Sequence, residues 1–200
     1  MKDLYLNHEE RFGPLLSNLY AMITKIGPMK GFYDFILEDL EGSRFTSILD
    51  VGTGPGIIPI RLSGMRRARI YAVDPSRDMI AIAKRKAGSA TKIKFALGSS
   101  RHVPFNIKFD MIISTLSFHH WARKKESLQY LKSLLAKGGQ IRIYERQRGS
   151  GLMFPGFSSH LLDIDEAISA VKSSGLKIVR VAKKNGFVCL TIKPAAGKHL

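Results

Sequence analysis

The sequence is poor in cysteine, in acidic side chains and in long hydrophobic runs. Cys189 is the one cysteine among 200 residues. It therefore excludes a disulfide framework and zinc sites built from four cysteines, or from two cysteines and two histidines. No run of about 18 apolar residues occurs, and the polar opening of the chain lacks the apolar core of a secretory signal. The sequence therefore predicts a protein without a membrane span in a reducing, cytoplasmic compartment.

The scarcity of acidic side chains leaves the chain strongly basic. It has 32 Lys and Arg against 16 Asp and Glu, a net charge of +16. The excess is uneven, because residues 1–45 carry 5 basic and 7 acidic side chains, whereas residues 46–149 carry 20 and 6. Such a charge indicates either an anionic partner such as RNA or simply good solubility, and it says nothing about the fold.

The first 45 residues have the pattern of a helical segment. Apolar side chains recur at helical spacing over residues 9–26 and 31–41, and Gly27-Pro28 separates the two stretches. We therefore expect two helices in residues 1–45, forming an extension that covers the site as a lid, and one domain over residues 46–200. A glycine-rich patch at residues 149–156 is expected to be a loop.

From Thr46 onward, short apolar runs alternate with helical stretches. Strands are expected at residues 46–51, 69–73, 93–97, 109–114 and 140–145, and helices at 57–65, 77–87, 122–136 and 163–174. Continuous apolar strands are typical of parallel sheets covered on both faces. Two last runs, 176–182 and 187–193, are joined by a sequence that ends in Asn185-Gly186, which is a hairpin signal. The predicted fold class is α/β, a doubly wound Rossmann-like sheet of about seven strands that ends in an antiparallel hairpin.

The first predicted strand runs into a glycine-rich turn, DVGTGPG, and then into a helix. This arrangement lets a ligand approach backbone amides at a helix N-terminus. The dinucleotide fingerprint needs a glycine where Ile57 stands, which disfavours NAD. The next strand ends at Asp74, whose carboxylate can accept two hydrogen bonds from a ribose diol. The pattern therefore predicts a ligand that contains a ribose.

Four stretches together resemble the successive motifs of class I S-adenosylmethionine-dependent methyltransferases: ILDVGTGPG, YAVDPSRDMIAIAK, FDMIISTLSFHHW and LKSLLAKGGQIRIYE. The resemblance covers roughly residues 46–145. Asp74–Met79 and the SFHHW stretch are similar to the small-molecule group that includes ubiquinone and menaquinone biosynthesis methyltransferases. The resemblance implies a sheet ordered 3-2-1-4-5-7-6 with an antiparallel strand 7, in agreement with the predicted hairpin.

The resemblance also implies how S-adenosylmethionine is held. Asp74 would hold the ribose, and Pro75 and Met79 would pack on the adenine. The methionine moiety would be held by residues of the first strand and the glycine-rich turn, namely Asp50, Gly52, Thr53, Gly54 and Gly56. Related enzymes commonly have Gly-Asp after the third strand, whereas this chain has Gly98-Ser99-Ser100. A neutral hydroxyl in place of a carboxylate gives up about 1 kcal/mol of a hydrogen bond, so we expect looser cofactor binding there. Ser99 and Ser100, with Ser114 and Thr115 after the fourth strand, complete the expected cofactor site.

Methyl transfer needs few catalytic side chains, because the methyl group on a sulfonium is already activated. The enzyme must align the acceptor and exclude water, and a base is needed only if the acceptor loses a proton. The candidates are His119, His120 and Tyr144, which follow the fourth and fifth strands. The histidines could equally cap a helix or pack, and Tyr144 and Glu145 could equally be structural.

Three functions fit these features. The first is methyl transfer to a small molecule, and the second is methylation of RNA or a ribosomal protein by means of the basic surface. The third is a regulatory module that binds the cofactor without turnover, which the serine at position 99 favours. Amino methylation of a nucleobase is disfavoured, since Ser114-Thr115-Leu116-Ser117 replaces the Asn/Asp-Pro-Pro-Tyr/Phe signature. Cys189, in the last strand, is too distant to attack a pyrimidine, and no metal site is expected.

Overall fold

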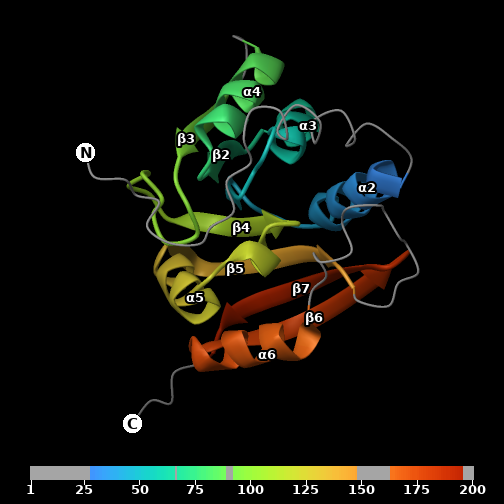
Figure 1. Cartoon of the computed structure of the whole chain (residues 1–200), viewed down its shortest axis with the longest axis vertical. Helices are drawn as coiled ribbons and strands as arrows, with labels where there is room; N and C mark the ends of the chain where they lie inside the picture. Colours follow the sequence, from blue (N-terminus) through green and yellow to red (C-terminus); the bar gives the residue numbers. More distant parts are fainter. Residues whose placement is uncertain (1–27, 66, 89–91, 148–162, 196–200) are drawn as a thin grey trace.

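The computed structural model describes residues 28–65, 67–88, 92–147 and 163–195. In these residues seven strands form a single sheet with the order β3-β2-β1-β4-β5-β7-β6 (Figure 1). The strands are β1 Ser47–Val51, β2 Arg69–Asp74, β3 Ile93–Leu97, β4 Phe109–Thr115, β5 Leu135–Arg146, β6 Leu176–Lys184 and β7 Phe187–Pro194. The helices are α2 Pro28–Glu41, α3 Ile57–Met65, α4 Arg77–Ala87, α5 Lys124–Ser133 and α6 Ile164–Ser173, with a 3₁₀ turn η1 at Phe118–His120.

Strand direction confirms the predicted topology. Strands β3, β2, β1, β4 and β5 pair in parallel, whereas β7 runs antiparallel to both β5 and β6. Val51 pairs with Val73 on one side and with Ser114 on the other. The carboxyl ends of β1, β2 and β4 therefore meet at one edge of the sheet, where ligands of open α/β sheets bind.

The β6–β7 hairpin forms at the predicted place because its turn residues suit the turn. Asn185 has φ of 51° and Gly186 has φ of 78°. Positive φ at both central residues is the requirement of the tight turn whose twist matches that of the flanking strands. The turn therefore fixes the register in which β7 pairs with β6.

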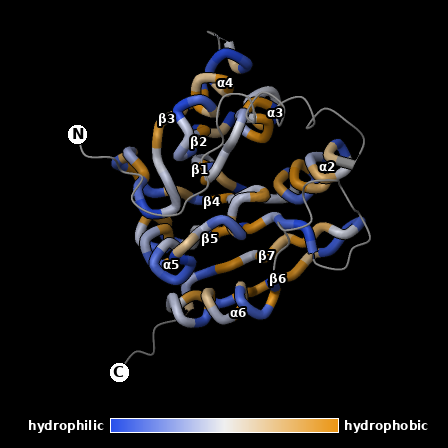
Figure 2. Tube along the Cα trace, viewed as in Figure 1, coloured by the Kyte–Doolittle hydropathy of each residue, from blue (hydrophilic) through white to orange (hydrophobic). Residues whose placement is uncertain are grey.

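Helices cover both faces of the sheet, as expected for strands that are buried on both sides. Residues of α5 and α6, such as Leu128, Leu131 and Val171, pack on one face of the sheet. Residues of α2 and α3, such as Ile36 and Leu62, pack on the other. Figure 1 shows α5 and α6 next to each other and apart from α2 and α3, and Figure 2 shows hydrophobic stretches along β4, β5 and β7 between them.

One predicted helix is confirmed, and another ends earlier than predicted. The second predicted N-terminal helix is confirmed as α2, Pro28–Glu41. The helix predicted over residues 122–136 is wrong at its end, because α5 stops at Ser133 and β5 already begins at Leu135. The apolar Leu134 and Leu135 suit either element, and pairing of Phe109 with Leu135 decides for the strand. The helix expected at residues 9–26 and the loop at 149–156 lie outside the described residues.

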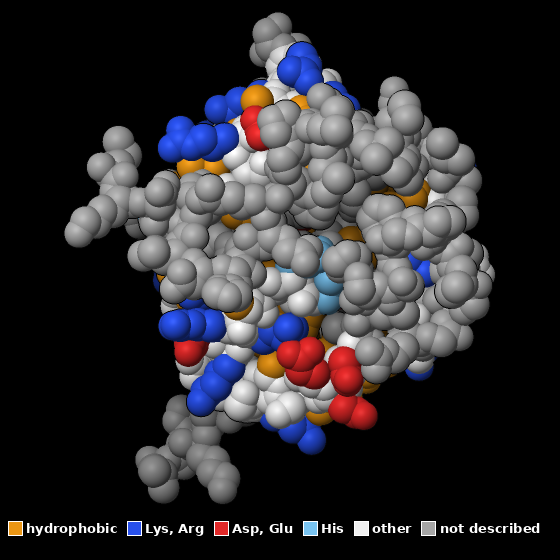
Figure 3. Space-filling view, viewed as in Figure 1, with side chains coloured by type: hydrophobic (Ala, Val, Ile, Leu, Met, Phe, Trp, Pro, Cys, Tyr) orange, Lys and Arg blue, Asp and Glu red, His pale blue; other side chains and the backbone are white. Residues whose placement is uncertain are grey.

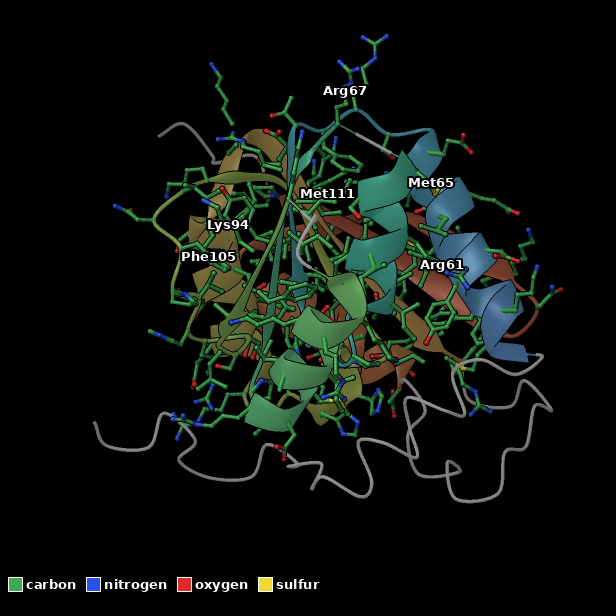
Figure 4. All side chains as sticks on the ribbon, turned by 90° about the horizontal axis from the view of Figure 1, so that it is seen from above. Arg61, Met65, Arg67, Lys94, Phe105 and Met111 are labelled. Atoms are coloured by element: carbon green, nitrogen blue, oxygen red, sulfur yellow. The ribbon has the colours of Figure 1, made fainter. Side chains whose placement is uncertain are left out.

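Asp39 of α2 connects this helix to three strands of the sheet. Its Oδ2 accepts hydrogen bonds from Nη1 of Arg142 and from the hydroxyl of Tyr144, both at 2.7 Å. Its Oδ1 accepts a hydrogen bond from Nη1 of Arg180, and the thiol of Cys189 lies 3.6 Å from Oδ2. These partners lie on β5, β6 and β7, so we call the five residues the Asp39 cluster. On the other side of α2, Arg61 of α3 lies between the two helices, with its Nη1 3.4 Å from Asp34 Oδ1 (Figure 4).

Within the described residues, none of the helices combines the length and apolarity that crossing a membrane requires.

Candidate cofactor and methyl-transfer site

The glycine-rich turn after β1 forms a tight loop beside β2. The backbone amides of Gly52 and Thr53 both donate to the carbonyl of Val73, at 2.9 and 3.0 Å. Gly52 has φ of 75°, and a Cβ there would lie 1.9 Å from Oγ of Ser117. Glycine is therefore required where this loop touches the loop that follows β4. Among the residues that the structure describes, a Cβ at Gly54 would meet nothing within 4 Å, so these residues leave space over the middle of the loop.

Asp74 braces this loop from the end of β2. Its Oδ2 accepts a hydrogen bond from the amide of Gly54 at 2.8 Å, and its Oδ1 accepts one from the amide of Ser76 at 2.8 Å. Ser76 in turn caps α4, its Oγ accepting from the amide of Met79. A carboxylate accepts hydrogen bonds only, so these contacts orient both oxygens of Asp74 at the end of β2. Asp74, Pro75 and Met79 thus lie together at the start of α4, as the sequence predicts.

Asp50 is a buried carboxylate with one oxygen unused. The side chain is 2% exposed, and Oδ2 accepts a hydrogen bond from Oγ1 of Thr53 at 2.7 Å. Oδ1 has no hydrogen-bond partner among the described residues. Burial raises the pKa of Asp50 to about 7, and the charge of Asp74 adds to the shift. A buried carboxylate in this state favours a cationic or hydrogen-bond-donating ligand, which would restore its ionised form.

The two serines after β3 have different environments. Asp74 pairs with Leu97, and the amide of Gly98 donates to the carbonyl of Asp74, so this segment lies directly beside the end of β2. The hydroxyl of Ser100 is buried and lies 2.8 Å from that of Ser127 on α5. Ser99 is partly exposed, and its Oγ accepts a hydrogen bond from the amide of Arg101. Of the two, Ser99 is therefore the one with a hydroxyl available to a ligand.

The end of β4 lies between the glycine-rich loop and β5. The hydroxyls of Ser114 and Thr115 are buried and have no partner among the described residues. Leu116 follows with φ of 48°, and its amide donates to the carbonyl of Tyr144 at 2.9 Å. A positive φ is costly for leucine, and such positions cluster at functional sites. This backbone turns the chain into η1, where the two predicted histidines are found.

His119 is held by Glu145. Nδ1 of His119 lies 2.9 Å from Oε2 of Glu145, and the backbone amide of His119 donates to Oε1 at 3.3 Å. Glu145 is fully buried, and the His119 side chain is 11% exposed. Figure 3 shows histidine side chains near the middle of the face of the molecule in view. The sequence indicates both residues but contains no local signal for their pairing, because they are 26 residues apart.

His120 and Tyr144 differ in their environment. The His120 ring centroid lies 3.9 Å from that of His119, and a catalytic role for His120 stays a prediction. Tyr144 is fully buried and its hydroxyl donates to Asp39. Burial, together with the charges of Cys189 and Asp39, raises the pKa of Tyr144 well above its ordinary value. These contacts favour a structural function for Tyr144, although no observation tests its predicted catalytic function.

Comparison with known proteins gives the same class as the geometry. Residues 48–139 match the family described as methyltransferase domain. Over these residues the chain is similar to methyltransferase domains, and its sheet has the strand order predicted above for class I enzymes. S-adenosylmethionine is the cofactor of this class, which agrees with the ribose-bearing ligand predicted from Asp74.

One curated relative and two solved structures are also similar to this chain. An uncharacterised methyltransferase of Bacillus cereus is 36% identical over 111 residues, covering 54% of this chain and 51% of the relative. The chain thus spans about half the length of that curated relative. A structure of a SAM-dependent methyltransferase from Aquifex aeolicus matches with a TM-score of 0.75 and 18% identity, covering 90% of this chain and 98% of the other. A structure of magnesium protoporphyrin IX methyltransferase from Synechocystis PCC 6803 with SAH bound matches with a TM-score of 0.63 and 16% identity. The match covers 93% of this chain and 90% of the other.

The polar groups of the candidate site fit this cofactor. S-adenosylmethionine offers an ammonium, a sulfonium and a ribose diol, all of which suit carboxylates. Oδ1 of Asp50 is buried without a partner among the described residues, and Oδ2 of Asp74 accepts a hydrogen bond from the amide of Gly54. The chain therefore has the two carboxylates and the open glycine loop that such a cofactor requires.

Proposed function

We propose that this protein transfers a methyl group from S-adenosylmethionine to a small-molecule acceptor by direct displacement. The observation that carries the proposal is the buried Asp50 near the end of β1, whose Oδ1 has no hydrogen-bond partner among the described residues. A buried carboxylate without a partner is costly, and a cationic ligand removes that cost. The methyl group of the bound cofactor is already activated, so the chain has to bind, orient and exclude water.

The proposed cofactor contacts follow from the positions described above. Asp50 would accept hydrogen bonds from the ammonium of the methionine moiety, with the amides of the glycine-rich loop around it. Asp74 would accept hydrogen bonds from the ribose hydroxyls, since it lies at the carboxyl end of β2 beside the glycine-rich loop. Met79, which is 2% exposed at the start of α4, and Pro75 would border the adenine, and Ser99 would accept from the adenine amine. Ser114 and Thr115 would line the approach to the methyl group.

Burial at the acceptor side supports a small substrate. Ser114 and Glu145 are fully buried, and His119 is nearly so. A base in a folded nucleic acid must be extruded to reach such a depth, and the residues after β4 lack the motif that stacks an extruded base. The likeness to magnesium protoporphyrin IX methyltransferase supports the same substrate class.

The basic surface is the reason to keep RNA as the second candidate. Two groups of exposed cations lie on different elements. The end of α4, which packs on β3, carries Lys84, Arg85 and Lys86, and β6 carries Lys177, Arg180, Lys183 and Lys184. Strands β3 and β6 are the two opposite edges of the sheet. These two groups of described cations are therefore separated by the width of the sheet, which argues against a single phosphate backbone that contacts both.

Transfer of labelled methyl groups tests the proposal. The protein is incubated with labelled S-adenosylmethionine and either the low-molecular-mass fraction or the total RNA of a cell extract, at low salt and at about 0.2 M salt. We expect label in the low-molecular-mass fraction, with a rate that changes less than twofold with salt, because a neutral acceptor releases few counterions. Label in RNA with a steep loss at higher salt would overturn the small-molecule proposal. Cofactor binding without label in any fraction would instead favour a module without turnover.

A further inference from the structure

We propose that Glu145 positions His119 as the general base for methyl transfer, so that the acceptor is a hydroxyl, amine or thiol that gives up a proton. The inference rests on the proposed function and adds the substrate's chemistry to it. His119 is the catalytic residue in this proposal, and Glu145 acts through it as a positioning residue.

The two hydrogen bonds to Glu145 determine which ring nitrogen is basic. A carboxylate can only accept, so the 2.9 Å contact with Oε2 requires a proton on Nδ1 of His119. The neutral ring then carries its lone pair on Nε2. The second bond, from the His119 amide to Oε1, holds the same residue at its backbone. Glu145 thus fixes both the orientation and the tautomer of the imidazole, as the carboxylate does in acid–histidine pairs of other enzymes.

The packing around η1 holds the segment that carries His119 against the glycine-rich loop through Ser117. Phe118 is fully buried, its ring meets that of Trp121 edge-on at 5.0 Å, and Nε1 of Trp121 donates to Oγ of Ser117 at 3.3 Å. Ser117 is the residue that occupies the Cβ position of Gly52. His119 therefore follows, by two residues, a side chain in contact with the loop that would hold the methionine moiety.

The proton balance is simple. As the acceptor atom forms its bond to the methyl carbon, its proton passes to Nε2 of His119, and the electron pair of the broken carbon–sulfur bond stays on the sulfur. The imidazolium that results lies against the Glu145 carboxylate, which stabilises its charge. A positioned base of this kind contributes about 10²–10⁴-fold to a rate.

Glu145→Gln should reverse the tautomer without changing the size of the side chain. The amide offers only one acceptor oxygen, and the backbone amide of His119 can only donate, so the oxygen should face the backbone. The NH₂ group would then face Nδ1, which has to become an acceptor, and the proton moves to Nε2. A histidine with a proton on Nε2 cannot accept another there while it stays neutral.

The ring nitrogens of His119 can be observed directly by ¹⁵N NMR. We expect Nδ1–H in the wild type and Nε2–H in Glu145→Gln, with methyl transfer to the low-molecular-mass extract lowered by about 100-fold or more. Calorimetric affinity for S-adenosylhomocysteine should stay within about threefold, because Glu145 makes no proposed cofactor contact. The matched control is Glu126→Gln, an exposed glutamate of α5 paired with Arg123, which should change none of these readouts.

Two results would overturn the inference: Nε2–H in the wild type, or a reversed tautomer with undiminished transfer. If Glu145→Gln does not fold, His119→Ala decides, since added imidazole should restore its lost transfer and a purely structural histidine would show no such rescue. Failure of the proposed function is distinguishable, because it appears as absent S-adenosylhomocysteine binding, or as an unlabelled low-molecular-mass fraction, in the wild type. The NMR comparison is independent of both.

Discussion

Asp39→Asn is expected to lower the free energy of unfolding by about 3 kcal/mol, as is typical when one partner of a buried ion pair is removed. Asp39 and Arg142 are 5% and 8% exposed, so neither group can turn to water instead. The carboxylate accepts from Arg142, Tyr144 and Arg180, all of which are donors. The NH₂ group of asparagine would face at least one of these donors and leave a buried arginine without a counter-charge. Denaturant titration of both proteins measures the difference.

The matched control is Asp34→Asn on the same helix, where an exposed carboxylate pairs with Lys30 and Arg61. Exposed pairs contribute little, so its unfolding midpoint should stay close to that of the wild type. Acid should mimic the Asp39 variant. Burial raises the pKa of Asp39, but the hydrogen bonds from Arg180 and Tyr144 and the charge of Arg142 outweigh burial and hold the pKa below 3.8. A lowered acid pKa means that this stabilisation is present above pH 4 and is lost as the pH falls through the folded-state pKa. Equal midpoints for the two variants would contradict the account of this cluster.

Asp50→Asn is expected to become more stabilising, relative to the wild type, as the pH rises. The folded protein holds the Asp50 proton up to a pKa of about 7, whereas an unfolded aspartate releases it near 3.8. Between these values the folded state binds more protons, so the wild type loses stability as the pH rises. For a carboxyl with these two pKa values, the loss between pH 5 and pH 8 is about 3 kcal/mol. Asparagine does not titrate, and the stability difference between the two proteins should therefore grow by that amount.

Denaturant titrations of the cofactor-free proteins at pH 5 and pH 8 measure this growth. Asp110→Asn is the control, because hydrogen bonds from Thr46 and Ser47 lower the pKa of Asp110. Its effect on stability should be the same at both pH values, since a lowered pKa titrates below this range. A pH-independent difference for Asp50→Asn would show that Asp50 stays ionised in the folded state, and it would contradict the raised pKa. The gain in stability should come with loss of cofactor affinity, as is common at functional sites.

Local patterns were sufficient to predict most of the fold. The hairpin turn depends on Asn185 and Gly186 themselves, and the glycine-rich loop depends on residues within one short segment. Both can therefore be predicted from neighbouring residues. The strand order follows from alternating strands and helices together with the resemblance, and it is confirmed. The predicted end of α5 was wrong because Leu134 and Leu135 fit a helix and a strand equally well. Pairing with Phe109, a distant residue, decides between them.

Long-range pairs are the part that the sequence could not provide. Asp39 and Arg142 are 103 residues apart, and their contact depends on where α2 lies on the sheet. One local signal was present, since an acid in the last turn of a helix opposes the helix dipole and so needs another partner. The pairing of His119 with Glu145 depends likewise on β4 and β5 being neighbours. The glycine-rich loop and Asp74, in contrast, were predictable because consecutive parallel strands end at the same edge.

Calorimetric titration with S-adenosylhomocysteine tests the central claim most directly. The wild type should bind it with a dissociation constant in the micromolar range, and Asp74→Ala should weaken binding more than about tenfold. Asp74→Ala removes the proposed acceptor for the ribose hydroxyls together with the hydrogen bond to the amide of Gly54. Asp78→Ala, which changes an exposed acid in the first turn of α4, should leave the affinity unchanged. Equal affinities for wild type, Asp74→Ala and Asp78→Ala, or no binding by the wild type, would contradict the account.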